Sequence, residues 1–258
     1  MTAPTEGSSL HLVLPSGASH DAYPDNTNGH YRVKLPQRLT SARGEWEVAL
    51  RSITYHNNWY NASGAHVVIE QPDGTKVRID FPDGRYNSIL DVIAKLYEVM
   101  ASKRLYRFIG LNYNTEHASI FMQMRYEGYT IQYSADLADM LGFIPSKKYK
   151  KDNEDGKIFP ENEPNMQTVY EQLYVYSNLC AERVVGDKSV PLLDNVPVRW
   201  TGSQTRLVGE TVQRPAYVPV NSLDTDVVEI DIRRRDGEPV VFRGGRVVVA
   251  VHLRKVSQ

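Results

Sequence analysis

The sequence predicts an all-β protein: an antiparallel sandwich or barrel that carries an inserted segment of mixed α and β structure. Three observations support this expectation. Runs of alternating apolar and polar residues fill the first and last thirds of the 258-residue chain. Clusters of Pro, Asn, Asp and Gly separate those runs, and amphipathic helix patterns occur only in the middle. Many short strands with frequent turns and few helices are typical of sandwiches and barrels.

Composition and charge narrow the class of protein. Hydrophobic residues make up 41% and charged residues 24% of the chain, and the formal net charge is −1. These values are ordinary for a soluble globular protein and favour neither nucleic acid, a membrane surface nor a polyanion as partner. No apolar run approaches the roughly 20 residues that a membrane helix needs. The single cysteine, Cys180, excludes an internal disulfide.

The first third is expected to form strands. Alternation predicts them at "SLHLVLP" (9–15), "HYRVKLP" (30–36) and "GEWEVALRSITY" (44–55). Between the first two lies "HDAYPDNTNGH", which is rich in turn-forming residues. Two further strand patterns, "AHVVIEQ" and "TKVRIDF", flank Pro72-Asp73-Gly74, so a hairpin is expected there.

The middle of the chain changes character. Residues 87–103 carry apolar side chains at 89, 92, 93, 96 and 100, which is the spacing of an amphipathic helix. Strand-like pieces, "LYRFIGLNY", "ASIFMQM" and "GYTIQYS", follow. A short helix is predicted in "SADLADMLGF", with Ser134 as its N-cap and Gly142 as its stop. Residues 146–166 are polar with mixed charge and are expected to form a solvated loop.

The last third returns to strands, and one of them is unusual. Strand patterns occur at "QLYVYSNL", "NVPVRW", "TRLVGE", "TDVVEIDIRRR" and "RVVVAVHLRK". In the first of these, Leu173 and Val175 point to one face while Tyr174 and Tyr176 point to the other. A half-buried strand normally carries polar residues on one face, so both faces of this strand are expected to be covered.

A search for reaction chemistry gives a mostly negative answer. None of the seven histidines forms a close ligand pair, and the sequence contains no GxSxG elbow, P-loop or GxGxxG motif. Cys180 is interpreted as a small buried apolar residue rather than a nucleophile. Asn61-Ala62-Ser63 matches the glycosylation pattern, we expect by chance. We therefore predict no enzyme activity, catalytic residue, metal or cofactor; a cupin-like enzyme would require histidines and carboxylates that converge only in the fold.

A cluster of arginines and the large number of tyrosines each have a functional and a simpler structural interpretation. Arg233, Arg234 and Arg235 form a dense basic patch at a hairpin, which suits nucleic acid or an acidic protein surface. More often such a patch keeps a hairpin end soluble and protects its edge. The sixteen tyrosines are expected mainly in core and cross-strand packing, with an interface as the second interpretation.

Several stretches together resemble one protein family. The likeness spans most of residues 20–255 in order, whereas residues 146–166 match nothing in the family pattern. It is carried by "YPDNTNGHYRVKLPQRLTSARGEWEVALRSITYHNNWYN", "FPDGRYNSILDVIAKL", "SADLADMLGF", "LYVYSNLCAERVVGDKSVPLLDNVPV" and "YVPVNSLDTDVVEIDIRRRDGEPVVFRGGRVVVAVHLRK". These blocks resemble the penton (minor capsid) proteins of Polinton/Maverick elements, adintoviruses and related virophages.

The resemblance implies a single jelly-roll protein that assembles as a homopentamer at the five-fold vertices of an icosahedral virion. Its partners would be copies of itself and a double jelly-roll major capsid protein, without specific nucleic-acid binding. Its location would be the virion capsid, assembled inside the host cell. From the change of pattern we place the jelly roll in residues 1–60 plus 167–258 and the inserted α+β segment in 61–166.

The resemblance also offers an answer for the strand with two large faces. One face would pack between the sheets of the roll, and Tyr174 and Tyr176 would meet a neighbouring subunit. Arg233, Arg234 and Arg235 are further candidates for that subunit interface. Coverage of the tyrosines within the same chain is an equally open alternative.

A second function is kept beside the capsid role. A β-sandwich at a virion surface can bind a carbohydrate or a receptor, and one fold hosts many functions. Exposed Trp59, Tyr60 or the aromatic residues of the inserted segment would carry that binding.

Overall fold

The computed structural model describes residues 9–42, 45–114, 119–198, 206–221 and 223–256. The chain forms two compact units. The described residues of Met1–Trp59, Tyr170–Arg199 and Gln204–Gln258 form the first, here called the roll unit. The described residues of Tyr60–Val169 form the second, here called the insert unit. The sequence-based limits, after residue 60 and before residue 167, stay a prediction of where the domains end.

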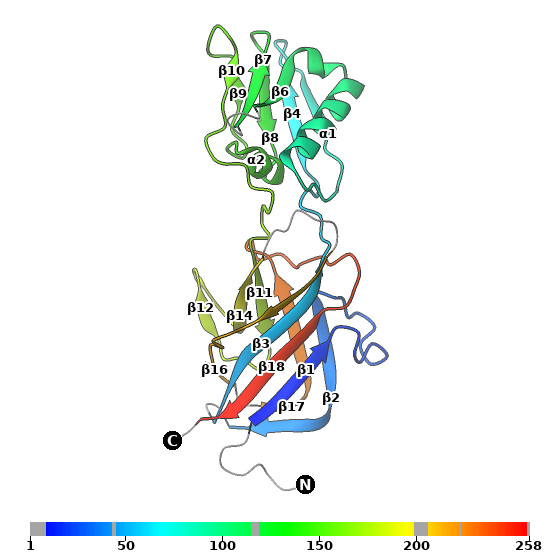
Figure 1. The fold of residues 1–258 in the computed structure, drawn as a ribbon, viewed down its shortest axis with the longest axis vertical. Helices are drawn as coiled ribbons and strands as arrows, with labels where there is room; N and C mark the ends of the chain where they lie inside the picture. The colour runs from blue at the N-terminus through cyan, green and yellow to red at the C-terminus, as the bar shows by residue number, and fades with distance from the viewer. Residues whose placement is uncertain (1–8, 43–44, 115–118, 199–205, 222, 257–258) are drawn as a thin grey trace. The chain divides into compact units, whose positions relative to one another are not determined.

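The roll unit contains two antiparallel sheets, here named after one central strand of each (Figure 1). The β3 sheet contains, in order, β1 (Ser9–Pro15), β18 (Val248–Lys255), β3 (Trp46–Asn57) and β15 (Arg206–Thr211), with β16 (Val218–Pro219) also paired to β3. The β11 sheet contains, in order, β14 (Leu192–Pro197), β11 (Gln172–Ser177), β17 (Leu223–Arg233) and β2 (His30–Ser41). A separate hairpin joins β12 (Arg183–Val185) to β13 (Lys188–Val190).

The pairing of these strands is nested. Among the eight longer strands described in the roll unit, the first pairs with the last, β1 with β18, and the second with the seventh, β2 with β17. The third pairs with the sixth, β3 with β15, and the fourth with the fifth, β11 with β14. A long antiparallel hairpin of four pairs, wrapped over two sheets, is a jelly roll. The predicted fold class, an all-β single jelly roll, is confirmed.

Alternation along the strands builds the core of the roll unit. Val228, Ile230 and Ile232 on β17 are fully buried, and Leu173 and Val175 on β11 face the same interior. Burying each such side chain contributes about 1.5–3 kcal/mol to folding.

A hydrogen bond also joins the two sheets at their edge strands. The Tyr31 hydroxyl on β2 donates to the Leu14 carbonyl on β1 at 2.9 Å. Because β2 and β1 belong to different sheets, this bond fixes one edge of the sandwich as well as satisfying a buried polar atom.

An aromatic cluster of the roll unit lies where the chain departs for the insert and returns from it. The Trp59 ring stacks on the Tyr170 ring with centroids 4.9 Å apart, and it also contacts Tyr55 and Phe242. Trp59 is only 1% exposed. The expectation that Trp59 is an exposed binding residue is therefore wrong, because its large ring is used to pack the two ends of the insertion together.

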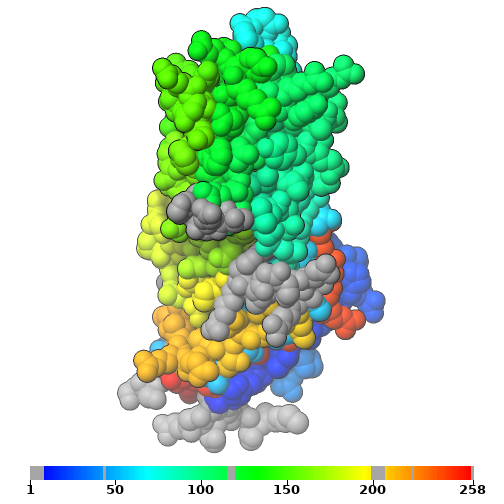
Figure 2. All heavy atoms as spheres, turned by 45° about the horizontal axis from the view of Figure 1, so that its top comes forward, coloured from blue at the N-terminus to red at the C-terminus, as the bar shows by residue number. Residues whose placement is uncertain are grey.

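The insert unit contains two small antiparallel sheets, two α-helices and a 3₁₀ turn (Figure 1). One sheet has the order β5 (Lys76–Asp80), β4 (His66–Glu70), β8 (Thr130–Tyr133) and β9 (Tyr149–Lys150); the other has β10 (Lys157–Ile158), β7 (Ser119–Met124) and β6 (Ile109–Asn114). The helical elements are α1 (Ile89–Ser102), η1 (Leu105–Arg107) and α2 (Ala135–Leu141). The two sheets and the helical elements share one continuous apolar core. Figure 2 shows one face of the molecule with all heavy atoms drawn.

Both predicted helices are present, for the expected local reasons. Ser88 caps α1 in a reciprocal capping box with Asp91. The apolar stripe of α1 is buried as Val92, Ile93, Leu96 and Met100. α2 ends at Gly142, whose φ of 78° is left-handed, and a β-carbon there would lie 2.2 Å from the Asn162 carbonyl oxygen. Only glycine fits this position.

Two middle segments differ from expectation. Residues 105–107 form the η1 turn, and the strand begins only at Ile109. Residues 146–166 are not simply a solvated loop, because β9 and β10 extend both sheets of the insert unit. Tyr149 is buried in that core, and Lys147 pairs with Glu161 at 2.7 Å. The charged side chains of this segment point outward, so its composition conceals the buried tyrosine.

Candidate assembly surface

Tyr174 and Tyr176 lie together on the outer face of the β11 sheet. Their neighbours along β11, Leu173 and Val175, are fully buried, whereas both tyrosines are half-buried. The register places Tyr174 opposite Arg233 on β17 and opposite Asn195 on β14. We call the outward residues Tyr174, Tyr176, Asn195, Asp231 and Arg233 the β11 outer face. It carries two aromatic rings in the middle of an otherwise polar surface.

Charges on the β11 outer face are balanced within the sheet. Arg233 pairs with Asp231 at 2.7 Å, and Asp231 lies opposite Tyr176 in the register. Burial raises the pKa of Tyr176; the charges of Tyr174 and Asp231 raise it further, and Arg233 opposes them. The Tyr176 hydroxyl therefore stays neutral, and the face offers aromatic area and hydrogen-bonding groups with little net charge.

The side chains of the three consecutive arginines have different partners, because the chain turns after β17. Only Arg233 belongs to the β11 outer face by register. Arg234 pairs with Asp236 at 2.7 Å and lies over the Tyr170 ring, and Arg235 pairs with Glu171 at 2.9 Å. Each guanidinium thus has a carboxylate partner within the chain, which removes most of the positive potential that a bare basic patch would offer to nucleic acid.

Cys180 has the properties of a structural residue. Its side chain is fully buried, and burial raises the pKa of its thiol to about 12. The thiolate is the reactive form of cysteine, so a neutral thiol inside the core has no nucleophilic role. The interpretation of Cys180 as a buried apolar residue is confirmed.

Asn61 is equally unavailable. Its amide nitrogen donates to the carbonyl oxygens of Tyr86 and Met166 at 2.9 Å each, and its amide oxygen accepts from the Tyr86 backbone N–H. Because the side chain is buried and fully bonded, it is not a surface acceptor for a sugar chain, and the pattern match is a chance one.

The fold brings together two histidines that the sequence keeps 241 positions apart, because β1 pairs with β18. The His11 and His252 rings stack with centroids 4.2 Å apart. The Tyr217 hydroxyl lies 2.7 Å from His252 Nδ1, and Arg254 lies over the Tyr217 ring. Sequence reasoning missed this pair, which only the register of two distant strands reveals.

The described parts of the chain contain no group of three or more histidine, cysteine or acidic side chains placed to hold a metal ion. Within those same parts, no helix is both long and apolar enough to cross a bilayer.

The aromatic residues of the inserted segment were expected as possible binding residues, although none of them was singled out. Tyr106 and Tyr126 are exposed there, and the stretch "KRLYRF" (103–108) places cations between aromatic residues. That mixture of cations and aromatic residues was visible in the sequence, but residues 105–108 were expected to belong to a strand.

Comparison with solved structures gives a whole-length similarity. The crystal structure of the mavirus penton protein matches with a TM-score of 0.56 and 11% identity, covering 96% of this chain and 100% of that one. This chain shares the penton protein's fold. A weaker similarity, with a TM-score of 0.48 and 8% identity, is to a chain of the Sputnik virophage structure, covering 96% of this chain and 98% of that one. No protein-family model and no curated protein matches the sequence.

Proposed function

We propose that this chain is a structural capsid protein: a penton that assembles as a homopentamer at the five-fold vertices of an icosahedral virion. One observation carries the proposal. The similarity to the mavirus penton protein covers 96% of this chain and 100% of that one, so it includes both the roll unit and the insert unit of this chain. Ordered sequence blocks across residues 20–255 point to the same family.

The proposed role requires shape and closure rather than chemistry. A five-membered ring is built from head-to-tail contacts, in which each subunit offers one surface and accepts a different one. The β11 outer face suits such a contact, because Tyr174, Tyr176 and Arg233 are of the residue types enriched at interface centres. Arg234 and Arg235 would flank it. Balanced charge on this face would spare the ring from repulsion between copies.

The remaining partners follow from the same proposal. The ring would sit among double jelly-roll major capsid proteins in the virion capsid, and assembly would take place inside the host cell. The chain would have no enzymatic role there, and no specific nucleic-acid contact is proposed.

Paired variants test the interface. Replacing both Tyr174 and Tyr176 with alanine removes the two half-buried outward rings while leaving the buried face of β11 intact. If those rings pack against a neighbour, the concentration for half-assembly in sedimentation velocity should rise at least about tenfold. Tyr126→Ala, an exposed tyrosine of the insert unit, is the matched control and should leave assembly unchanged. Equal assembly of the double variant and the control would refute the assignment of this face.

A further inference from the structure

The insert unit carries an exposed group of aromatic rings. Tyr106, in η1, is 39% exposed, and Tyr126, in the turn between β7 and β8, is 55% exposed. Phe108 stacks on Tyr129 with centroids 4.6 Å apart and meets the Tyr126 ring edge-on at 5.6 Å. Arg107 interacts with both Tyr106 and Tyr126, which links Tyr106 to these rings. We call the four aromatic residues the aromatic shelf. A contiguous group of exposed apolar side chains, unlike singly scattered ones, is typical of an interaction site.

The shelf is held in place by the core of the insert unit. Leu105 and Ile109, on either side of its first segment, are buried. The Arg125 backbone N–H donates to the Phe108 carbonyl at 2.9 Å, which joins the two segments. Gly128, with φ of 82°, closes the second segment against Pro72. The rings are therefore presented by two braced segments, so little ordering is needed for a ligand to bind.

Four cations belong to the two chain segments that carry the shelf. Lys103, Arg104, Arg107 and Arg125 are all exposed, and no carboxylate of a described residue forms an ion pair with any of them. Arg104 is the N-cap residue of η1 and Arg107 is its last residue, so both flank Tyr106 in the chain. The Arg107 guanidinium lies 5.9 Å from the Tyr106 ring centroid. These cations, unlike the paired Arg233, Arg234 and Arg235, are available to an anion.

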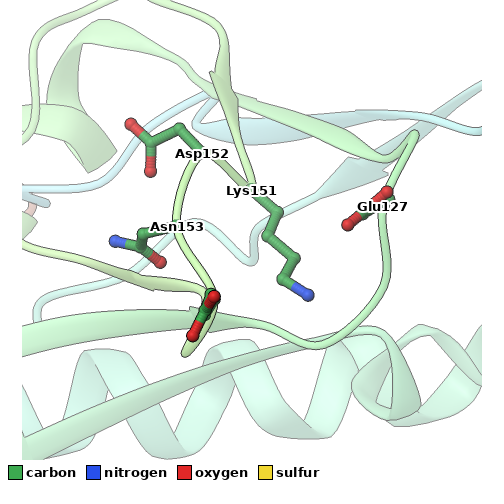
Figure 3. Close-up of a pocket in the computed structure, with 5 residues that line it drawn as sticks. Glu127, Lys151, Asp152 and Asn153 are labelled. Atoms are coloured by element: carbon green, nitrogen blue, oxygen red, sulfur yellow. The ribbon is translucent and has the colours of Figure 1, made fainter.

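A polar hollow lies beside the shelf. It has a volume of about 310 Å³ and is lined by Glu127, Lys151, Asp152, Asn153 and Glu154. Glu127 directly follows Tyr126 in the chain. Figure 3 shows Lys151 extending between Glu127 on one side and Asp152 and Asn153 on the other. Carboxylate and amide oxygens accept hydrogen bonds from hydroxyl groups, and an ammonium donates to them.

Exposed aromatic rings beside unpaired arginines indicate which class of ligand the shelf can bind. Aromatic faces attract the C–H groups of a sugar ring, because the face of the π-system is negative. Unpaired guanidinium groups bind carboxylate or sulfate with charge-assisted hydrogen bonds. A long polyanion fits less well, since residues 60–169 hold 13 lysines and arginines against 15 aspartates and glutamates.

We propose that the aromatic shelf, with Arg104, Arg107 and Arg125, binds an acidic glycan, a carboxylated or sulfated oligosaccharide. One sugar ring stacks on Tyr106 and Tyr126, its acidic group pairs with the arginines, and hydroxyls of the next sugar reach Glu127 and Asn153 in the hollow. The site lies wholly within the insert unit and does not depend on ring assembly. If the chain is pentameric, five copies would raise a weak single-site affinity through avidity.

Binding of purified full-length protein to defined probes tests the proposal. The probes are 3′-sialyllactose for a carboxylated glycan, a heparin tetrasaccharide for a sulfated one, neutral lactose, and a short oligo(dT) for nucleic acid. Saturation-transfer NMR detects contact, and titration gives affinity. We expect at least one acidic probe to bind at least about tenfold more tightly than lactose. Which of the two binds identifies the acidic group. Failure of both acidic probes, or tighter binding of oligo(dT), would overturn the proposal.

Two variants locate the site. Tyr106→Ala with Tyr126→Ala removes the stacking faces, and Arg107→Gln with Arg125→Gln removes charge while keeping similar bulk. Each pair should weaken the acidic probe at least about tenfold. Arg235→Gln, a paired arginine of the roll unit, is the matched control and should change nothing. All these side chains are exposed or on the surface, so thermal melts should remain close to wild type. Unchanged binding in both double variants would place the glycan elsewhere and refute this site.

Discussion

Cys180 and His252 show how burial sets the behaviour of single residues. Cys180 is enclosed in the roll unit, and the pKa of its thiol is raised to about 12. The native protein should therefore react with a thiol reagent such as DTNB only as fast as it unfolds, and one equivalent should react immediately in denaturant. Rapid stoichiometric reaction of the folded protein at neutral pH would contradict the described burial.

His252 links stability to pH. Burial lowers the pKa of its imidazole below the ordinary 6.5, and His11 on β1, Arg51 on β3 and Arg254 on β18 lower it further. Of the other neighbours, Tyr217 is hydrogen-bonded to Nδ1, and Glu47 is paired with Arg254. Because the unfolded chain binds the proton more readily, stability is complete above about pH 6.5 and falls as the pH drops toward the lowered pKa.

The pH dependence gives a direct test. His252→Gln keeps a polar side chain that does not titrate, so it should lose less melting temperature than wild type between about pH 7.5 and about pH 5.5. His20→Gln, at an exposed turn position, should follow wild type. Identical pH profiles for wild type and His252→Gln would show that His252 does not titrate differently on folding.

For Tyr174 and Tyr176, the sequence predicted the orientation of the side chains but not their contacts. Alternation showed that the β11 strand has two large faces, and the structure places Leu173 and Val175 in the core and the tyrosines outside. The alternation pattern of a strand does not show which surface packs against its outward side chains. The assignment of Tyr174 and Tyr176 to a subunit interface therefore rests on the proposed ring. Trp59 was misjudged for a similar reason: no local pattern reveals that Tyr170, 111 positions later, stacks on it.

At the scale of elements, the Trp59 cluster joins the beginning and end of the insertion. Trp59→Ala leaves a large cavity among Tyr55, Tyr170 and Phe242, and should lower the free energy of unfolding of the roll unit by about 3–5 kcal/mol. Trp59→Phe keeps most of the ring contact and should lose clearly less. Chemical denaturation followed by circular dichroism measures both. A loss below about 1 kcal/mol for the alanine variant would mean that the cluster does not hold these ends.

Elements with local signals were predictable, and elements with distant partners were not. The capping box of α1, the Gly142 stop of α2 and the Pro72-Asp73-Gly74 hairpin are encoded within a few residues. In contrast, β9 and β10 are two residues long and exist because β8 and β7 supply their partners. The polar composition of residues 146–166, with its many charged side chains, did not indicate these two strands.

At the scale of the whole molecule, the jelly roll is a property of pairing. Paired residues of β1 and β18 are more than 230 positions apart in the chain, and those of β2 and β17 are more than 180 positions apart. Alternation identified the strands but not their order, so the sequence pattern alone predicted a sandwich or barrel. Ordered blocks that resemble penton proteins supplied the jelly roll, and the nested pairing confirms it independently of that resemblance.

The central claim is that this chain forms the five-fold vertex of a capsid. Light scattering on a sizing column, across a concentration series, measures the solution mass most directly, for the protein alone and with its matching major capsid protein. If the protein is a penton, we expect a species of about five times 29.3 kDa, either for the protein alone or when the major capsid protein is present. A strict monomer at every concentration, with no association with the major capsid protein, would contradict it.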